Sequence, residues 1–353
     1  MLSLHDYKHL VDEAIQLEYS VAIERAQAID GSYGDLLREM SRFIGKGGKR
    51  IRPYLAYLAY VGFGGQNTQM SARAGASLEL LHNFLLIHDD IIDRDLVRYG
   101  GPNVQGAYLH KLRGSLSHDA EHGAASAAIL AGDVACSLAH TVIYELEIDD
   151  TAKLRILRAL SDAVFVTGGG EMVDSLAGAL NHANLTEDQI YSVYLSKTAH
   201  YTFYLPLRVA AAMAGKDSSI DSLLLELAQP IGLAYQMRDD YLGLFGDPEK
   251  TGKPITGDIR EGKQTIYFAL MQKNCSEQDR VELDQIYGSP SASEKEVYRV
   301  REICEKCGAK DQVEAKIHEL YDDACSKLAE IGLSEEARTA MQEILYVSTH
   351  RHE

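Results

Sequence analysis

Apolar residues recur three and four positions apart along most of the chain. In residues 6–28, for example, they occupy Leu10, Ala14, Leu17 and Val21. This spacing places them on one face of an α-helix of 3.6 residues per turn. The same pattern predicts long helices over 71–97, 126–146, 151–179, 186–213 and 222–245. The alternation expected of β-hairpins is almost absent.

Local signals mark where several of these helices begin. Thr186 and Gln189 have the spacing of a capping box. Residues 45–48 interrupt the helical pattern, and Pro53 follows where a new helix can start. No proline- or serine-rich linker, low-complexity tract or solenoid-length repeat divides the chain. We therefore expect an all-α protein, a helical bundle formed as one domain over residues 1–353.

Composition and charge narrow the classes of function. Apolar residues make up 46% of the 353 residues, so the chain can bury a large core. The formal net charge of −17 argues against a general binder of nucleic acids or anionic membranes. No signal peptide is visible, and no apolar stretch approaches the roughly 20 residues that cross a bilayer. We expect a cytoplasmic location.

The five cysteines form an odd and sparse set, so a disulfide framework is not expected. Cys304 and Cys307 make a single Cys-x-x-Cys pair, which fits half of a zinc site, a redox pair or two ordinary thiols. No second pair follows. The interpretation as ordinary thiols near a helix end, with Gly308 as the terminator, is favoured.

Two clusters of aspartates interrupt otherwise apolar helices. The first contains Asp89, Asp90 and Asp93, and the second contains Asp239 and Asp240. On a helix, residues four apart lie on the same face, so Asp89 and Asp93 repel one another. Mg²⁺ would compensate this repulsion, because it binds one or two protein carboxylates and completes its shell with water and phosphate.

A solvated helix end would explain one such cluster equally well, since runs of charge are usually surface features. Two clusters in apolar helices favour facing carboxylate sets at the mouth of a bundle core, like those of helical metalloproteins.

A glycine-rich basic segment provides groups for phosphate binding. Four of the seven residues 46–52 are basic, in a chain that is otherwise strongly acidic. They lead into a predicted helix N-terminus, where free amides and the helix dipole favour anions. A flexible basic loop with no ligand is the alternative. Arg98 and the pair Lys197-Thr198 would each be surface or packing residues if taken alone.

Together these residues resemble the trans-polyprenyl diphosphate synthases, a family that includes farnesyl and geranylgeranyl diphosphate synthases. The resemblance covers about residues 45–265, with the motifs in the order typical of the family. They are Gly-Gly-Lys-Arg-Ile-Arg-Pro (47–53), Leu-His-Asn (81–83), His-Asp-Asp-Ile-Ile-Asp (88–93), Ala-Gly-Asp (131–133), Lys-Thr (197–198), Tyr-Gln-Met-Arg-Asp-Asp (235–240), Gly-Lys-Pro (252–254) and Asp-Ile-Arg-Glu-Gly-Lys-Gln-Thr (258–265). It implies an isoprenoid-synthase helical bundle around an apolar cavity, and a homodimer.

The resemblance also implies a reaction, in which an allylic diphosphate ionises and is attacked by isopentenyl diphosphate. Isopentenyl diphosphate would be bound through its diphosphate by Lys49, Arg52 and His82. Three Mg²⁺ ions would be held by Asp89, Asp93 and Asp239. The allylic diphosphate would contact Arg98, Lys197 and Lys253, with Lys263 nearby. The space where the allylic cation forms would be lined by Thr198 and Gln236.

The chain departs from the family pattern at three places. Tyr99 stands where a second arginine is usual, which puts one contact to isopentenyl diphosphate in doubt. Gly243 replaces the third aspartate of the second motif, so Asp239 is expected to keep the metal role. A usual Gly-Gln pair appears as Gly170-Glu171, which adds an acidic group.

Product length is expected to depend on bulk one turn before the first aspartates, at Phe84 and Leu85. Here only the position farther from Asp89, Phe84, is aromatic. This pattern resembles that of family members that make the twenty-carbon product. Geranylgeranyl diphosphate is therefore favoured over farnesyl diphosphate, although Phe84 also fits a plain core residue.

Three other classes of protein fit the sequence less well. A class I terpene cyclase lacks the glycine-basic segment and needs Ser or Thr where Gly243 stands. A regulatory subunit without activity usually loses aspartates that are intact here. A di-iron bundle needs two Glu-x-x-His motifs, and only Glu79–His82 fits.

Overall fold

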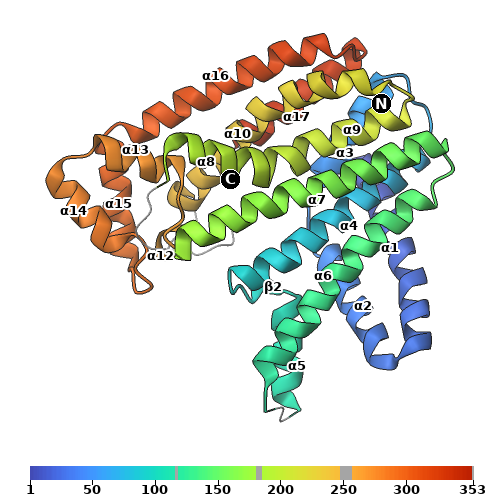
Figure 1. The fold of residues 1–353 in the computed structure, drawn as a ribbon, viewed down its shortest axis with the longest axis horizontal. Helices are drawn as coiled ribbons and strands as arrows, with labels where there is room; N and C mark the ends of the chain where they lie inside the picture. Colours follow the sequence, from blue (N-terminus) through green and yellow to red (C-terminus); the bar gives the residue numbers. More distant parts are fainter. Residues whose placement is uncertain (116–117, 180–184, 247–256, 352–353) are drawn as a thin grey trace. The chain divides into compact units, whose positions relative to one another are not determined.

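The computed structural model describes residues 1–115, 118–179, 185–246 and 257–351. Helices make up nearly all the regular structure of these residues, so the all-α prediction is confirmed (Figure 1). The chain separates into two compact units, residues 1–160 with 206–217 and residues 161–205 with 218–353. The expectation of one domain, with an apolar cavity inside the bundle, stays a prediction.

The first unit is built around α4, which packs against α1, α3 and α6. Its elements are α1 (Leu4–Ile29), α2 (Gly31–Gly45), α3 (Ile51–Gly62), α4 (Thr68–Ile92), β1 (Val97–Arg98), β2 (Gly101–Pro102), α5 (Val104–Gly114) and α6 (Ala120–Tyr144). Two helices belong partly to each unit, α7 (Asp150–Ala179) and α9 (Leu205–Met213). Helices α1 and α2 run as a hairpin joined at Asp30, whose carboxylate accepts from the Ser32 amide (Figure 1).

Helix α4 ends earlier than the sequence pattern predicts. Its last residue is Ile92, and Arg94 follows in the left-handed region with φ 60°. The predicted extension of this helix to residue 97 is therefore wrong. The chain instead forms a small antiparallel hairpin in which Arg98 pairs with Gly101. Its two turn residues, Tyr99 and Gly100, both have positive φ, as a type I′ turn requires.

Helix α6 is an exception to the expectation that no segment could cross a membrane. It is 25 residues long, and its mean hydropathy reaches 1.5 over an 18-residue window. Core helices of soluble proteins meet the same two criteria, so this is weak evidence. The buried side chains of α6 recur three and four apart, as in Ala124, Ala128 and Ala131, on the face that packs against α4 and α5.

The second unit is built around α10 (Asp221–Phe245), which packs against α16, α17 and a π-helix, η1. Its other elements are α8 (Glu187–Tyr194), η1 (Leu195–Tyr204), the 3₁₀ turn η2 (Ser218–Ile220), α12 (Gly257–Arg260), α13 (Ile266–Asn274), α14 (Glu277–Ile286), α15 (Glu294–Lys306), α16 (Ala309–Glu330) and α17 (Glu335–His350). A continuous apolar core joins α8, α10 and α13 to α16.

The helix predicted over 186–213 forms three elements, α8, η1 and α9. The capping box of Thr186 and Gln189 at its start is confirmed. Two glycines allow close approach of the backbone of η1. A Cβ atom at Gly232 on α10 would overlap Ala199, and one at Gly170 on α7 would lie 2.7 Å from the Lys197 amide nitrogen.

All five cysteines have free thiols. Cys304 is fully buried in the apolar core of the second unit, and Cys307 is partly buried beside it. Gly308 follows with φ 74° and separates α15 from α16, as the sequence predicts. These positions fit the interpretation of the pair as ordinary thiols.

Candidate active site

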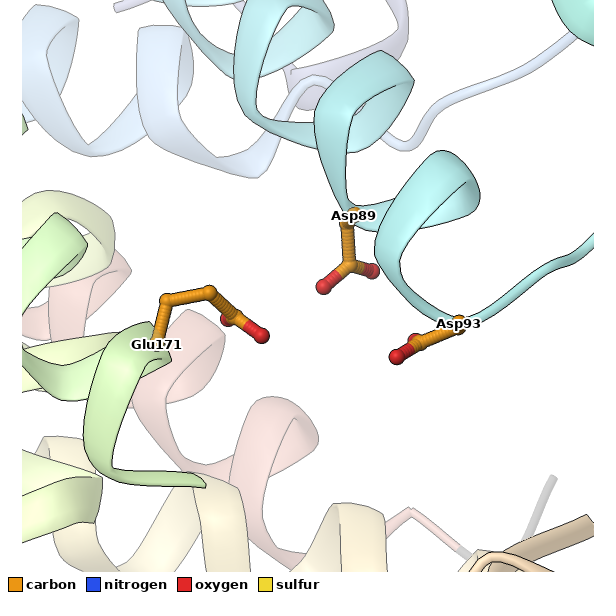
Figure 2. Close-up of side chains that lie close together, drawn as sticks. All are labelled: Asp89, Asp93 and Glu171. Carbon is orange, nitrogen blue, oxygen red and sulfur yellow. The ribbon is translucent and has the colours of Figure 1, made fainter. Parts of the chain in front are cut away.

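The first aspartate cluster lies at the C-terminal end of α4. Figure 2 shows Asp89 and Asp93 one turn apart, with both carboxylates directed to the same side of the helix. A carboxylate oxygen of Asp89 and one of Asp93 lie within 4.8 Å of each other. Asp89 is half-buried and Asp93 is exposed. His82 lies on this face of α4 too, two turns before Asp89.

Asp90 points away from this face and has a different environment. It is 2% exposed, and its Oδ1 accepts from the Arg98 Nε at 2.6 Å. Arg98 Nη2 also reaches Asp89 Oδ2 at 3.3 Å. Burial raises the pKa of Asp90 to about 6, because the loss of solvent outweighs the opposing charge of Arg98. The type I′ hairpin therefore delivers one arginine to two adjacent aspartates.

The raised pKa of Asp90 predicts a pH dependence of stability. Folded protein binds this proton more tightly than unfolded protein, whose aspartate has a pKa near 3.8. The stabilisation is thus complete below about pH 4 and is lost as pH rises through about 6, by up to roughly 3 kcal/mol. Asp90→Asn should flatten the plot of unfolding free energy against pH between about pH 4 and 6. The free energy is measured by urea unfolding at each pH, with EDTA present to remove metal ions. Asp95→Asn is the control, and an equal change of slope in both variants would contradict the assignment.

Basic side chains of the same unit surround His82. The pKa of His82 is held well below its ordinary value, first by burial and then by the charges of Arg52, Arg98 and Arg50. The imidazole is therefore neutral at physiological pH and has one N–H to donate. Lys49 is exposed at the end of the glycine segment. That these groups form an anion site stays a prediction, and the structure corrects one part of the sequence interpretation, which concerns Arg50.

Arg50 is turned into the protein and not toward a ligand. Its side chain is 5% exposed and pairs with Glu79. The sequence pattern counted it among the residues available for phosphate, and the structure shows that this is wrong for its guanidinium. Tyr99, at the position of the usual second arginine, places its ring against Gly47 and stacks obliquely on Phe43.

In the second unit, Asp240 on α10 is buried among polar groups. It accepts hydrogen bonds from the Tyr194 hydroxyl and from Gln236 Nε2, and Lys263 Nζ lies 3.8 Å from its Oδ1. Burial raises the pKa of Asp240 to about 7, and the positive charge of Lys263 opposes this. The pKa of Lys263 is raised well above its usual range, chiefly by the charge of Asp258, so this lysine stays protonated.

Asp239 is half-exposed and ion-paired with Arg351, whose Nη2 lies 2.8 Å from its Oδ1. The Arg351 guanidinium also stacks 4.7 Å from the ring centre of Tyr235. The residue before Asp239, Arg238, is 1% exposed and donates from Nε to the Thr349 carbonyl at 2.8 Å. This bond holds the chain next to Arg351 against α10.

The π-helix η1 supplies the predicted Lys197-Thr198 pair. Lys197 Nζ lies 2.8 Å from Glu171 and 2.8 Å from Asp174, both on α7 (Glu171 is labelled in Figure 2). Thr198 Oγ1 donates to Gln236 Oε1 at 2.5 Å. The amide of Gln236 is thus held at both ends, since its Nε2 is bonded to Asp240.

Gly243, the departure in the second motif, has a local structural reason. A Cβ atom there would overlap the carboxylate of Asp258. A third aspartate at 243 would therefore displace Asp258 from its place beside α10.

The structure thus brings the predicted residues together within each unit. In the first unit these are Arg52, His82, Asp89, Asp93 and Arg98, and in the second they are Lys197, Thr198, Gln236, Asp239 and Lys263. Lys253 lies outside the described residues. The two aspartate clusters belong to different units, so their facing each other stays a prediction.

Sequence reasoning missed several residues that touch these groups. The i, i+3 spacing of Glu171 and Asp174 on one helix could have indicated a paired lysine. Arg351 and Tyr194 carry no local signal, because they reach Asp239 and Asp240 from more than 40 residues away.

Comparison with known proteins places this arrangement in context. The family described as polyprenyl synthetase matches residues 35–304. A short chain isoprenyl diphosphate synthase of Methanothermobacter thermautotrophicus is 33% identical over 312 residues, which cover 88% of this chain and 86% of that one. A (2E,6E)-farnesyl diphosphate synthase of Mycobacterium tuberculosis is 31% identical over 86% of this chain and 80% of its own length.

Among solved structures, the chain is similar to geranylgeranyl pyrophosphate synthase of Corynebacterium glutamicum, complexed with isoprenyl diphosphate and magnesium. The TM-score is 0.92 with 31% identity, over 99% of this chain and 100% of that one. The likeness to a polyprenyl synthase of Caulobacter crescentus, at 24% identity and a TM-score of 0.79, concerns the fold alone.

Proposed function

The chain belongs to the polyprenyl synthetase family, and from this premise we propose that it condenses isopentenyl diphosphate with an allylic diphosphate to make geranylgeranyl diphosphate. Membership makes it a prenyltransferase of isoprenoid biosynthesis. The allylic primer is dimethylallyl, geranyl or farnesyl diphosphate. Farnesyl diphosphate is the alternative product.

One observation carries the proposal. A single face of α4 presents a neutral histidine, His82, and two turns later a pair of close carboxylates, Asp89 and Asp93. Arg52 and Arg98 provide positive charge beside the same histidine. This face of α4 thus offers two carboxylates to a divalent cation, and together with Arg52 of α3 and Arg98 of β1 it offers a hydrogen-bond donor and positive charge to a diphosphate.

The reaction breaks a C–O bond, forms a C–C bond, and then breaks a C–H bond as a new double bond forms. The allylic C–O bond breaks, and its electron pair leaves with the diphosphate. The double bond of isopentenyl diphosphate attacks the resulting cation, and a proton is then lost, in this family usually to the departing diphosphate. Lys49, Arg52 and His82 would hold isopentenyl diphosphate. Because His82 is neutral, it can donate an N–H hydrogen bond to this diphosphate without adding a positive charge that would attract another anion.

The residues fit magnesium. Two carboxylates within 4.8 Å on one helix face are hard oxygen ligands at a suitable separation, and Asp239 offers a further half-exposed carboxylate. Bound Mg²⁺, three ions in this proposal, would neutralise charge that builds on the leaving diphosphate. The protein groups would position that diphosphate and exclude water, which would quench the cation.

Residues of the second unit would complete the allylic subsite. Lys197, Lys263 and Lys253 would provide positive charge to the diphosphate, together with Arg98 of the first unit. The oxygens of Thr198 and Gln236 are fixed by their mutual hydrogen bond and would face the allylic cation. A fixed dipole stabilises a developing charge without reorganising during the reaction.

The central experiment is a product assay. Radiolabelled isopentenyl diphosphate is incubated with each of the three primers and Mg²⁺, and the dephosphorylated products are separated by chromatography. We expect a twenty-carbon alcohol from every primer. Consumption of an allylic substrate without isopentenyl diphosphate would indicate a cyclase, and activity only with a partner protein would indicate a regulatory subunit.

Product length gives a separate prediction. Phe84 is half-buried one turn before Asp89, with its ring 4.9 Å from that of His88. Phe84→Ala should open this place and lengthen the product by one or more five-carbon units, read from the same chromatogram. Phe63→Ala, which removes an aromatic ring at the end of α3, should leave the length unchanged. An unchanged product from Phe84→Ala would assign Phe84 to the core alone.

We also propose that the enzyme is a cytoplasmic homodimer. Large apolar side chains are exposed on α6 and α7, including Leu130 at 58% and Phe165 at 84%. Exposed apolar surface of this kind is typical of subunit contacts. Sedimentation of the purified protein would measure its mass, and a monomer at micromolar concentration would contradict the assignment.

A further inference from the structure

Arg50 lies among the basic residues of the glycine segment, but its environment is that of a structural group. It is one of three non-glycine residues with positive φ among the described residues, at φ 53°. It precedes α3 as the N-cap residue and makes no side-chain cap hydrogen bond. Its side chain is 5% exposed. An arginine is held here in an unfavourable backbone conformation, so the surrounding contacts must compensate for it.

The Arg50 guanidinium contacts three separate elements. Nε donates to Asp12 Oδ1 on α1 at 2.8 Å, and Nη1 donates to Glu79 Oε2 on α4 at 2.7 Å. Nη2 donates to the Ile44 carbonyl near the end of α2 at 2.8 Å. One side chain thus closes the segment from 44 to 50 and ties it to two helices.

A second cationic side chain, Lys8 on α1, reinforces the same connection. Lys8 Nζ donates to the Gly48 carbonyl at 3.2 Å and lies 3.2 Å from Asp12 Oδ2. Asp12 therefore links two cations that hold the glycine segment, at residues 48 and 50. The segment is fixed by charged contacts from outside, although Gly47 and Gly48 would otherwise leave it free to move.

The partner Glu79 connects this network to the proposed substrate groups. Glu79 is 3% exposed and lies one turn before His82 on α4. Lys49 and Arg52 flank Arg50 on either side in the chain. Buried ion pairs contribute little net stability compared with apolar contacts, but removing one partner is costly because it leaves a buried charge without a counterion.

We propose that Arg50 is a positioning residue, which sets the separation of Lys49, Arg52 and His82 so that together they fit one diphosphate. This inference rests on the proposed function and deepens it. Arg50 does not touch substrate. It acts through the segment that carries two of the three groups and through the carboxylate beside the third.

The test separates the two substrates. Arg50→Met should raise the KM for isopentenyl diphosphate at least about tenfold, because displacement of a binding group by an ångström has effects of this size or larger. The KM for the allylic diphosphate and kcat should change less than about threefold. Arg50→Lys keeps the charge without the planar fork and should give a smaller rise.

Arg73→Met is a matched control. Arg73 also joins α4 to α1, through Glu18 at 2.8 Å, but does not reach the glycine segment. It should leave both KM values unchanged. Asp12→Asn, in a half-exposed partner, removes one contact with less risk to folding and should raise the same KM in the same direction. Thermal unfolding of each variant reports any loss of fold.

A direct binding measurement keeps the inference independent of activity. Inorganic pyrophosphate is titrated calorimetrically in EDTA into wild type, Arg50→Met and Arg73→Met. At least about tenfold weaker binding by Arg50→Met alone supports the inference, even if wild type shows no prenyl transfer and the proposed function fails. Equal binding by all three proteins, or an equal rise of both KM values in Arg50→Met, would overturn it.

Discussion

Asp89→Ala should lower kcat at least about a hundredfold, because removing one preorganised electrostatic group from a charge-stabilising site has effects of this size. Asp89 is the half-buried member of the carboxylate pair on α4, within 4.8 Å of Asp93. Its loss would leave the proposed metal position with one protein ligand from this helix. Turnover is measured at saturating Mg²⁺ with both substrates, and circular dichroism should show the helical signal intact.

Asp95→Ala is the control for this prediction, since it removes an aspartate just past the end of α4 and outside the proposed ligand set. It should keep most of the activity. Asp89→Asn preserves the size of the side chain but removes its charge. It should resemble the alanine variant, because the charge is what binds the metal. If Asp89→Ala turned over at a near-normal rate, the assignment of a metal to this helix would be wrong.

Gly232→Val should lower the free energy of unfolding by about 3 kcal/mol, the upper part of the range for overpacked interiors. Even a Cβ atom at this position would overlap Ala199, so α10 and η1 would have to separate. The change should also lower turnover, because Thr198 and Gln236 adjoin this contact and would lose their hydrogen bond. Urea unfolding measures the stability.

Gly169→Ala is the matched control, a substitution of a helical glycine in the same unit that should not lower the free energy of unfolding. No atom lies within 4 Å of a Cβ atom built there. Alanine is preferred over glycine in a helix by about 1 kcal/mol, so this variant should be as stable as wild type or more stable. A Gly232→Val protein as stable as Gly169→Ala would show that the helices are not in the close contact described.

Much of the fold could be predicted from the sequence because helix periodicity is a local property. The pattern over 222–245 became α10, Asp221–Phe245, almost without change. The pair Asp89 and Asp93 was predictable for the same reason, since four residues make about one turn.

The errors arose where tertiary contacts decide the backbone. The hairpin after α4 depends on Tyr99 adopting a positive φ that few non-glycine residues tolerate. The π-helix η1 packs closely against Gly232 and Gly170, where a side chain would overlap it. The spacing of apolar residues in the sequence does not indicate this contact. Arg50 looked like its neighbours because charge can be read from a sequence, whereas the direction of a side chain cannot.

If Asp239 binds magnesium as proposed, its contact with Arg351 would affect any measurement of the affinity. The guanidinium already occupies the carboxylate with a 2.8 Å ion pair, braced by Tyr235. An incoming cation at Asp239 has to displace a charge that belongs to the protein. A titration would therefore report the difference between two competing interactions, and its apparent dissociation constant would equal the intrinsic value of that site divided by the fraction of molecules in which the arginine is disengaged.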